Sequence, residues 1–140
     1  MRRKCEFISK RNEDLHRAYK EVVNSGKYNN IIDCIKESLT LPASKFWISS
    51  ENAARIISRM EKGDNLQNIS PLRKEMFLEL HKRFLEEKVR HPESKSVYKI
   101  CEIIIEQPAP RFYIGLQRGI KIIKQERSKR WKMMLDKLNN

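Results

Sequence analysis

The sequence predicts an all-α fold, with two tandem three-helix (helix-turn-helix-like) units related by internal duplication, plus a C-terminal basic helix. Apolar residues recur at helical spacing along most of the chain. Glycine is rare, at four of 140 residues, and runs rich in Val and Thr are scarce. The third observation is a similarity between the two halves of the chain, which appears when one half is shifted by 66 positions.

The first half is expected to form three helices, at about residues 9–24, 31–40 and 50–63. Ser9 can cap the first helix, and Ser49 or Ser50 can cap the third. Gly26 suits the left-handed turn that ends the first helix, and Pro42 stops the second.

The second half repeats this order after a linker at residues 64–70. Ser70 and Pro71 form a cap followed by proline at the first helical position. The helices are expected at about residues 71–87, 96–106 and from 115 onward.

The connection between the second and third helices of each half is an unusual proline-containing segment. It reads LPASKFWIS at residues 41–49 and QPAPRFYIG at 107–115. Proline at 108 lacks an amide hydrogen and disfavours the α conformation of the residue before it. We therefore expect an extended elbow in which Phe112 and Ile114 turn inward, followed by a helix that starts in a new direction.

The repeat is supported by matched residue types at an offset of 66, including prolines, aromatic anchors and an apolar pair. Upstream, RNEDLHRAY from Arg11 resembles RKEMFLELH from Arg73 at an offset of 62, which places four extra residues within KVRHPESKS. The matched positions are Pro42 and Pro108, Ala43 and Ala109, Phe46 and Phe112, Ile48 and Ile114, and Ile56-Ile57 and Ile122-Ile123. The predicted domains are residues 1–63, a linker at 64–70, residues 71–127, and an amphipathic tail helix at 128–140.

The net charge is +12, from 30 Lys and Arg against 18 Asp and Glu, with a pI near 9.8. A surplus of this size favours a polyanionic partner. The surplus is concentrated at residues 111–137, where nine basic residues stand against Glu126 and Asp136.

The third helix of each half is the candidate nucleic-acid-binding element. In the second half, Leu116, Gly119, Ile120 and Ile123 share one face, and Arg, Lys and Gln gather on the other. Arg and Gln can pair with base edges in a major groove, and Lys with phosphates. The first half offers a less positive face, where Glu51 would repel phosphate. The candidate residues are Arg111, Gln117, Arg118, Lys121, Lys124, Arg127, Lys129 and Arg130, and in the first half Asn52, Arg55 and Arg59.

The tail at 128–140 combines basic residues with an apolar stripe at Trp131, Met134, Leu135 and Leu138. Such a helix can fold back on the chain, pair with a second chain as a homodimer, bind a partner, or lie on an anionic membrane surface. We expect packing within the chain, because an exposed stripe is a liability.

Motifs for catalysis are absent from the sequence, so we expect no enzyme, no metal site and no cofactor. His16, His81 and His91 lack metal-ligand spacing, and no phosphate loop or nucleophile motif occurs. Three widely spaced cysteines, Cys5, Cys34 and Cys101, favour reduced thiols. With no signal-peptide pattern and no membrane span, we expect a cytoplasmic protein, nucleoid-associated if it binds DNA.

The order helix, helix, elbow, helix resembles the tri-helical helix-turn-helix class of DNA-binding domains. The doubled sequence, with Pro108 to Tyr113 reading PAPRFY, is also similar to small, basic, uncharacterised bacterial proteins with a motif of this type.

These observations predict a non-catalytic protein that binds double-stranded DNA, as a regulator or an architectural factor. One alternative is a protein-interaction scaffold for an acidic partner. Another is an RNA-binding module, in which exposed Trp47 and Tyr113 would stack on bases.

Overall fold

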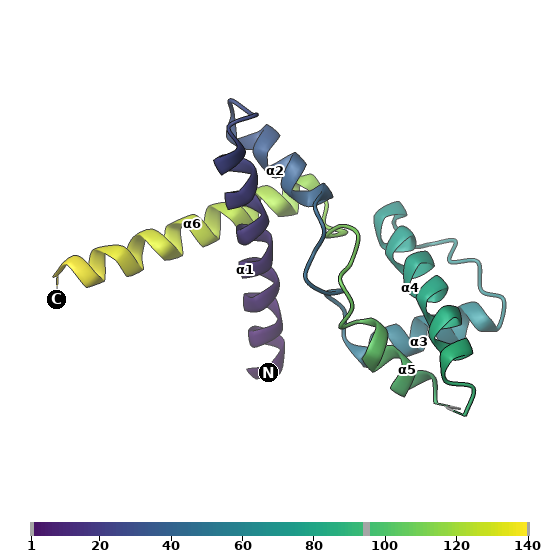
Figure 1. Cartoon of the computed structure of the whole chain (residues 1–140). Coiled ribbons are helices and arrows are strands. Elements are labelled where there is room, and N and C mark those ends of the chain that lie inside the picture. The colour runs from purple at the N-terminus through teal and green to yellow at the C-terminus, as the bar shows by residue number, and fades with distance from the viewer. Residues whose placement is uncertain (1, 94–95, 140) are drawn as a thin grey trace. The chain divides into compact units, whose positions relative to one another are not determined.

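A computed structural model describes residues 2–93 and 96–139, with side chains from Glu6 onward. The described residues form six α-helices and no β-strand, which confirms the all-α prediction (Figure 1). The helices are α1 (Arg2–Ser25), α2 (Ile31–Thr40), α3 (Ser50–Glu61), α4 (Pro71–Arg90), α5 (Val97–Ile104) and α6 (Leu116–Asn139).

Most helix ends follow from the local sequence. The side chain of Asn30 accepts a hydrogen bond from the Asp33 amide at 2.8 Å and caps α2, and Ser49 caps α3. Gly26 ends α1 with a φ of 69°. The expected cap at Ser9 is wrong, because α1 begins at Arg2, where Arg, Lys and Glu favour a helix.

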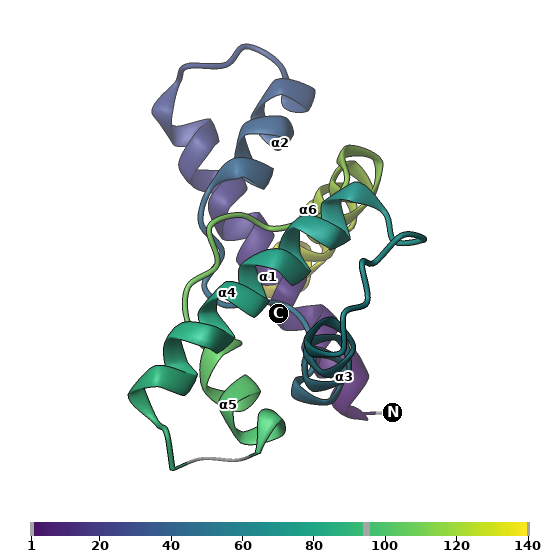
Figure 2. The same ribbon diagram turned by 90° about the vertical axis from the view of Figure 1, so that its right-hand side faces the viewer.

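The helices gather into two compact units that divide the chain differently from the predicted domains. Unit 1 consists of residues 1–43 together with 110–140, and unit 2 consists of residues 44–109. Unit 1 therefore contains α1, α2 and α6, and unit 2 contains α3, α4 and α5 (Figure 1; Figure 2). The third helix of each predicted repeat, 1–63 and 71–127, packs with the first two helices of the other repeat.

In unit 1, α6 approaches α2 closely at Gly119. A Cβ atom at this position would lie 3.1 Å from Leu39 Cδ1 and 3.4 Å from Ile35 Cγ2, so only glycine fits without movement of the neighbours. The core around this contact is aliphatic, with aromatic anchors. Its buried residues include Leu15, Ala18, Tyr19 and Val22 of α1, Cys34 of α2, Phe112 and Ile114 of the elbow, and Ile122 and Ile123 of α6.

Unit 2 has its own core and a buried anchor in the predicted linker. Leu66 is 2% exposed and has a φ of 58°, an unusual conformation for a non-glycine residue. Asp64 holds this turn, since its carboxylate accepts hydrogen bonds from the Leu66 amide at 2.8 Å and from Arg59 Nε at 2.8 Å. The buried residues include Phe46, Ile48, Ala53, Ile56, Ile57, Met76, Phe77, Leu80, Phe84, Ile100, Cys101 and Ile104.

A backbone hydrogen bond fastens the elbow of each unit. In unit 2, the Phe46 amide donates to the Ile105 carbonyl at 2.9 Å, and in unit 1 the Phe112 amide donates to the Leu39 carbonyl at 3.2 Å. Phe46 and Phe112 are 66 positions apart, as are Leu39 and Ile105. Phe112 and Ile114 are buried, as predicted for the inward-facing anchors. Each elbow therefore bonds to the end of a helix from the other predicted repeat.

An arginine also holds the proline of each elbow. Arg83 donates from Nη1 to the Pro108 carbonyl at 2.8 Å, and its guanidinium lies 4.9 Å from the centre of the Phe46 ring. Arg17 donates to the Pro42 carbonyl at 3.4 Å while it pairs with Asp14. Each contact lies within one unit and holds the carbonyl of the elbow proline in place.

Cys34 and Cys101 are buried, and both carry free thiols. Burial raises the pKa of Cys101 to about 11, so this thiol is a poor nucleophile. The side chain of Cys5 lies outside the described residues. Within the described part of the chain, no helix combines the length and the apolarity that crossing a membrane requires.

We predict that residues 44–109 fold as an isolated fragment. The two ends of this segment are joined by the Phe46–Ile105 hydrogen bond, and its core is contained within it. A core of this size is expected to be marginally stable but cooperative. Circular dichroism should show a helical fragment with a sigmoidal thermal transition, and an unfolded fragment would contradict the division into units.

We also predict that Gly119→Val destabilises the full chain by about 1–3 kcal/mol, because the added methyl groups overpack the contact with Leu39. Gly115→Val is the matched control, since no atom lies within 4 Å of a Cβ at that position. Denaturant titration measures both variants. Equal stabilities of the two variants would refute the close approach of α6 to α2.

Candidate nucleic-acid interface

Nearly all of the net positive charge of the chain lies in unit 1. Its residues include 18 Lys and Arg against 8 Asp and Glu, for a net charge of +10. Unit 2 has 12 against 10, for +2. The packing of α6 with α1 and α2 therefore collects a surplus that the linear sequence spreads over both ends of the chain.

The predicted binding residues of α6 lie on its exposed surface. The helix buries Gly119, Ile122, Ile123 and Glu126 against α1 and α2. The buried face is thus rotated from the predicted one, because Ile122 is buried while Leu116 and Ile120 are only half-buried. The exposed candidates are Gln117, Arg118, Lys121, Lys124, Arg127, Lys129 and Arg130.

Within residues 2–93 and 96–139, the cations of α6 form no ion pair, whereas several arginines of unit 2 are paired. Arg59 lies 2.7 Å from Asp64, and Arg83 lies 3.0 Å from Glu79. Arg55 forms no ion pair of this kind, but its Nη2 donates a hydrogen bond to Asn52 Oδ1 at 3.3 Å. The three candidates on α3 are therefore exposed but engaged with neighbours, while the positive field of α6 is not neutralised locally.

Helix α1 adds cations to the surface of α6 in a way that the sequence analysis missed. Burial and then the nearby Arg118 guanidinium lower the pKa of Arg11. Burial of His16 also lowers its pKa, to about 4, with further contributions from Arg130, Lys20 and Arg127. Arg11, His16 and Lys20 lie at least 96 positions before the start of α6, so no local signal in the sequence could place them there.

Arg111 differs from the other candidates because it is held in place at the elbow. Its side chain is half-buried, and its guanidinium lies 5.9 Å from the centre of the Tyr113 ring. Lys45 takes the same position over Trp47 at 5.4 Å in unit 2. Both aromatic rings are half-buried and already engaged by a cation, which leaves less of each face for a stacked base.

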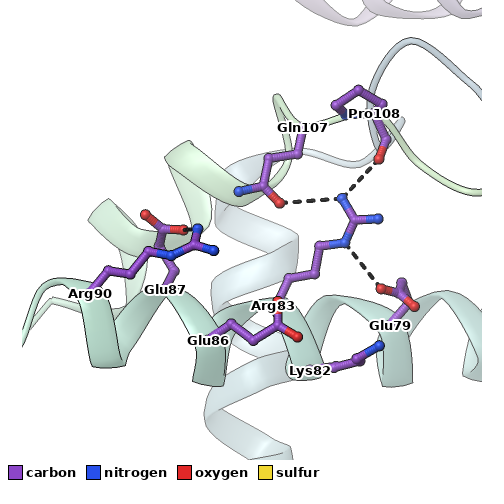
Figure 3. A pocket seen from close by; sticks show the side chains of 8 residues that line it. All are labelled: Glu79, Lys82, Arg83, Glu86, Glu87, Arg90, Gln107 and Pro108. Carbon is purple, nitrogen blue, oxygen red and sulfur yellow. Dashed lines mark hydrogen bonds and ion pairs between the residues drawn. The ribbon is translucent and has the colours of Figure 1, made fainter.

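Unit 2 has a polar depression of 420 Å³ between α4 and the start of the second elbow, at Gln107 and Pro108 (Figure 3). Arg83 lies at its centre and bonds to Glu79, to the Gln107 side chain at 3.2 Å and to the Pro108 carbonyl. Arg90 bonds to Glu87 at the edge of the depression. Arg83 and Arg90 are paired with lining residues, so the centre of the depression serves to brace Pro108, while Lys82 and Glu86 line it without a contact drawn in Figure 3.

Among the described residues, no group of three or more His, Cys, Asp or Glu side chains could hold a metal ion. No protein-family model, curated protein or solved structure matches the chain. The surface of α6 and α1 in unit 1 is therefore the site from which a function can be argued.

His16 provides a test of the cationic surroundings in unit 1. The pKa of His16 is about 4 in the folded protein and about 6.5 in the unfolded chain, so folding favours the neutral side chain. This contribution to stability is complete above about pH 6.5 and is lost as the pH falls toward 4. The linkage amounts to about 2 kcal/mol between pH 7.5 and pH 5.

We therefore predict that His16→Gln flattens the pH dependence of stability over that range by about 2 kcal/mol. Urea titrations of both proteins at pH 7.5, 6.0 and 5.0 measure the difference, and carboxylate titrations cancel in the comparison. Parallel pH profiles for the two proteins would contradict the environment assigned to His16.

Proposed function

We propose that the chain is a non-catalytic DNA-binding protein, a regulator or an architectural factor, that contacts the duplex through α6 of unit 1. The observation that carries this proposal is the row of exposed cations on α6 without ion-pair partners among the described residues, in a unit with a net charge of +10. Such a row attracts phosphates, because none of its cations is held in an ion pair by a carboxylate of the described residues.

The geometry of α6 supports groove contact in particular. Its buried face packs against α1 and α2, so the helix is held as a rigid rod with its polar face outward. Arg118 and Gln117 in the first turn can reach base edges, while Lys121 and Lys124 contact the phosphates that flank them. Arg11 and Lys20 of α1 extend the cationic surface beside it and would contact phosphates next to those.

We further propose that the two units descend from one duplicated three-helix segment. Equivalent backbone bonds at Phe46 and Phe112, and an arginine at the proline of each elbow, support this origin. In unit 2 the equivalent face of α3 carries Asn52, Arg55 and Arg59, and Arg59 is neutralised by its ion pair with Asp64. Unit 2 then contributes weakly to DNA binding, and a DNA-binding protein of this kind would be located in the cytoplasm, on the nucleoid.

The structure gives less support to the single-strand alternative. Trp47 and Tyr113 are half-buried under Lys45 and Arg111, whereas single-strand binding relies on open aromatic faces. A scaffold for an acidic protein would use the same cations, so it is separated from DNA binding only by experiment.

The test is the binding of the full chain to a mixed-sequence duplex across a salt series. We predict that changing Arg118, Lys121 and Lys124 to Ala weakens binding at least about tenfold and lowers the slope of log K against log salt by about 2–3. The slope changes because three phosphate contacts no longer release counterions.

The matched control changes Lys62, Lys82 and Lys99 to Ala, which removes the same charge from exposed positions of unit 2. This variant should bind almost as the unaltered chain does. Equal losses of duplex affinity in both variants would show that binding depends on the net charge of the chain and not on the position of the cations on α6. No duplex binding at low salt would end the proposal, and RNA and acidic proteins would then be tested.

A further inference from the structure

The last three turns of α6 expose an apolar stripe that DNA binding does not explain. Trp131 is 58% exposed and Leu138 is 75% exposed, and Met134 and Leu135 are also exposed. The expectation that this tail packs within the chain is wrong, since every residue from Arg127 to Asn139 is exposed. Figure 1 shows this part of α6, in yellow, extending past the point where the helix meets α1.

The stripe faces a different direction from the buried side of α6. An α-helix turns about 100° per residue, so the four apolar residues of the stripe fall within about 100° of arc. On average, Gly119, Ile122, Ile123 and Glu126 point about 120° away from the centre of this arc, and Ile123 is nearest to it at about 70°. The packing of α6 with α1 and α2 can therefore persist while the stripe contacts another molecule or a membrane surface.

Cations line both edges of the stripe. On the helical wheel, Arg130 and Lys137 lie about 100° to one side of the stripe, and Lys132 lies about 110° to the other. Arg127, at the start of the segment, falls within the arc of the stripe, one turn before Trp131. Asp136, the one acidic residue between Arg127 and Asn139, points away from the stripe. On a flat surface made of an anionic layer over an apolar one, the apolar side chains of the stripe would reach the apolar layer. The cations along both margins would remain at the anionic layer.

We propose that the segment Arg127–Asn139 of α6 lies on the surface of an anionic lipid bilayer, with Trp131, Met134, Leu135 and Leu138 inserted at the boundary between headgroups and acyl chains. Tryptophan favours this depth because its ring is amphipathic. Lys and Arg can extend their long side chains back to the phosphates of the headgroups. The inference goes beyond DNA binding, because none of the four apolar residues is assigned to the duplex, although Arg127, Lys129 and Arg130 of the same segment are also candidate contacts to nucleic acid.

Other occupants fit the stripe less well. A second copy of the chain would bring together two segments that each have five basic residues and one acidic residue, so their charges repel. Double-stranded DNA would satisfy the cations but offers the four apolar residues no apolar surface to bury.

The fluorescence of Trp131 can report the insertion. In the full chain with Trp47→Phe, Trp131 is the remaining tryptophan of the two. Its emission should shift to shorter wavelength with phosphatidylglycerol vesicles and stay unchanged with phosphatidylcholine vesicles. Co-sedimentation of the unaltered chain with the same vesicles provides a second measurement that does not depend on the Trp47 substitution.

Two variants separate the apolar and the ionic parts of the interaction. Met134→Ser with Leu138→Ser should abolish both the shift and the co-sedimentation but leave duplex affinity unchanged. Lys132→Gln with Lys137→Gln should weaken vesicle binding on the order of twentyfold, as expected for two cations near an anionic surface. Circular dichroism confirms that each variant remains folded.

Three outcomes would overturn the proposal. The first is the absence of a shift and of co-sedimentation with phosphatidylglycerol vesicles. The second is equal binding to both lipids, which would remove the role of the cations. The third is a shift that depends on protein concentration without vesicles, which would assign the stripe to a second copy of the chain. None of these outcomes bears on the duplex titration, so the two proposals fail independently.

Discussion

The two elbows are the constraint on which the arrangement of the helices depends. Each is a short non-helical segment whose proline prevents the preceding helix from continuing, and in the second one Tyr113 has a φ of 55°. Each is then fixed by one backbone hydrogen bond, from Phe46 to Ile105 or from Phe112 to Leu39. Because the aromatic side chain next to each bond is buried, the elbow cannot move without opening a core. Each bond lies within one unit and ties the elbow to a helix of that unit.

The elbows also decide where the charge goes. Since α6 packs with α1 and α2, the cations of residues 111–137 share a unit with Arg11 and Lys20. If α3 had packed there, its paired Arg59 and its acidic Glu51 would have diluted this surface. The buried His16 stays neutral beside Arg127 and Arg130, which is the least costly state for a titratable group among cations. The polyanion site proposed for α6 is therefore a consequence of the helix arrangement as much as of composition.

Most of the secondary structure could be predicted because its signals are local. The bounds of α2 and the turn at Gly26 were predicted correctly, and Ser49 was one of the two candidate caps of α3. Phe112 and Ile114 were expected to point inward, and both are buried. The errors arose where local signals competed. Ser9 resembled a cap but lies inside a longer helix, and the buried face of α6 includes Ile122 and Glu126 because two helices contact it. The tail stripe was expected to be covered because apolar residues usually are, yet α6 extends past its partners.

By itself the sequence determined the helices, the breaks between them, the inward anchors and the polar face of α6, because each depends on neighbours within a few residues. Only the tertiary structure decided which third helix packs with which pair. The two halves resemble each other in sequence at the elbow and in the third helix, so α3 and α6 have similar apolar patterns. Local sequence cannot distinguish two arrangements that bury nearly the same contacts, as in domain swapping. The choice depends on long-range packing, such as the contact of Gly119 with Leu39.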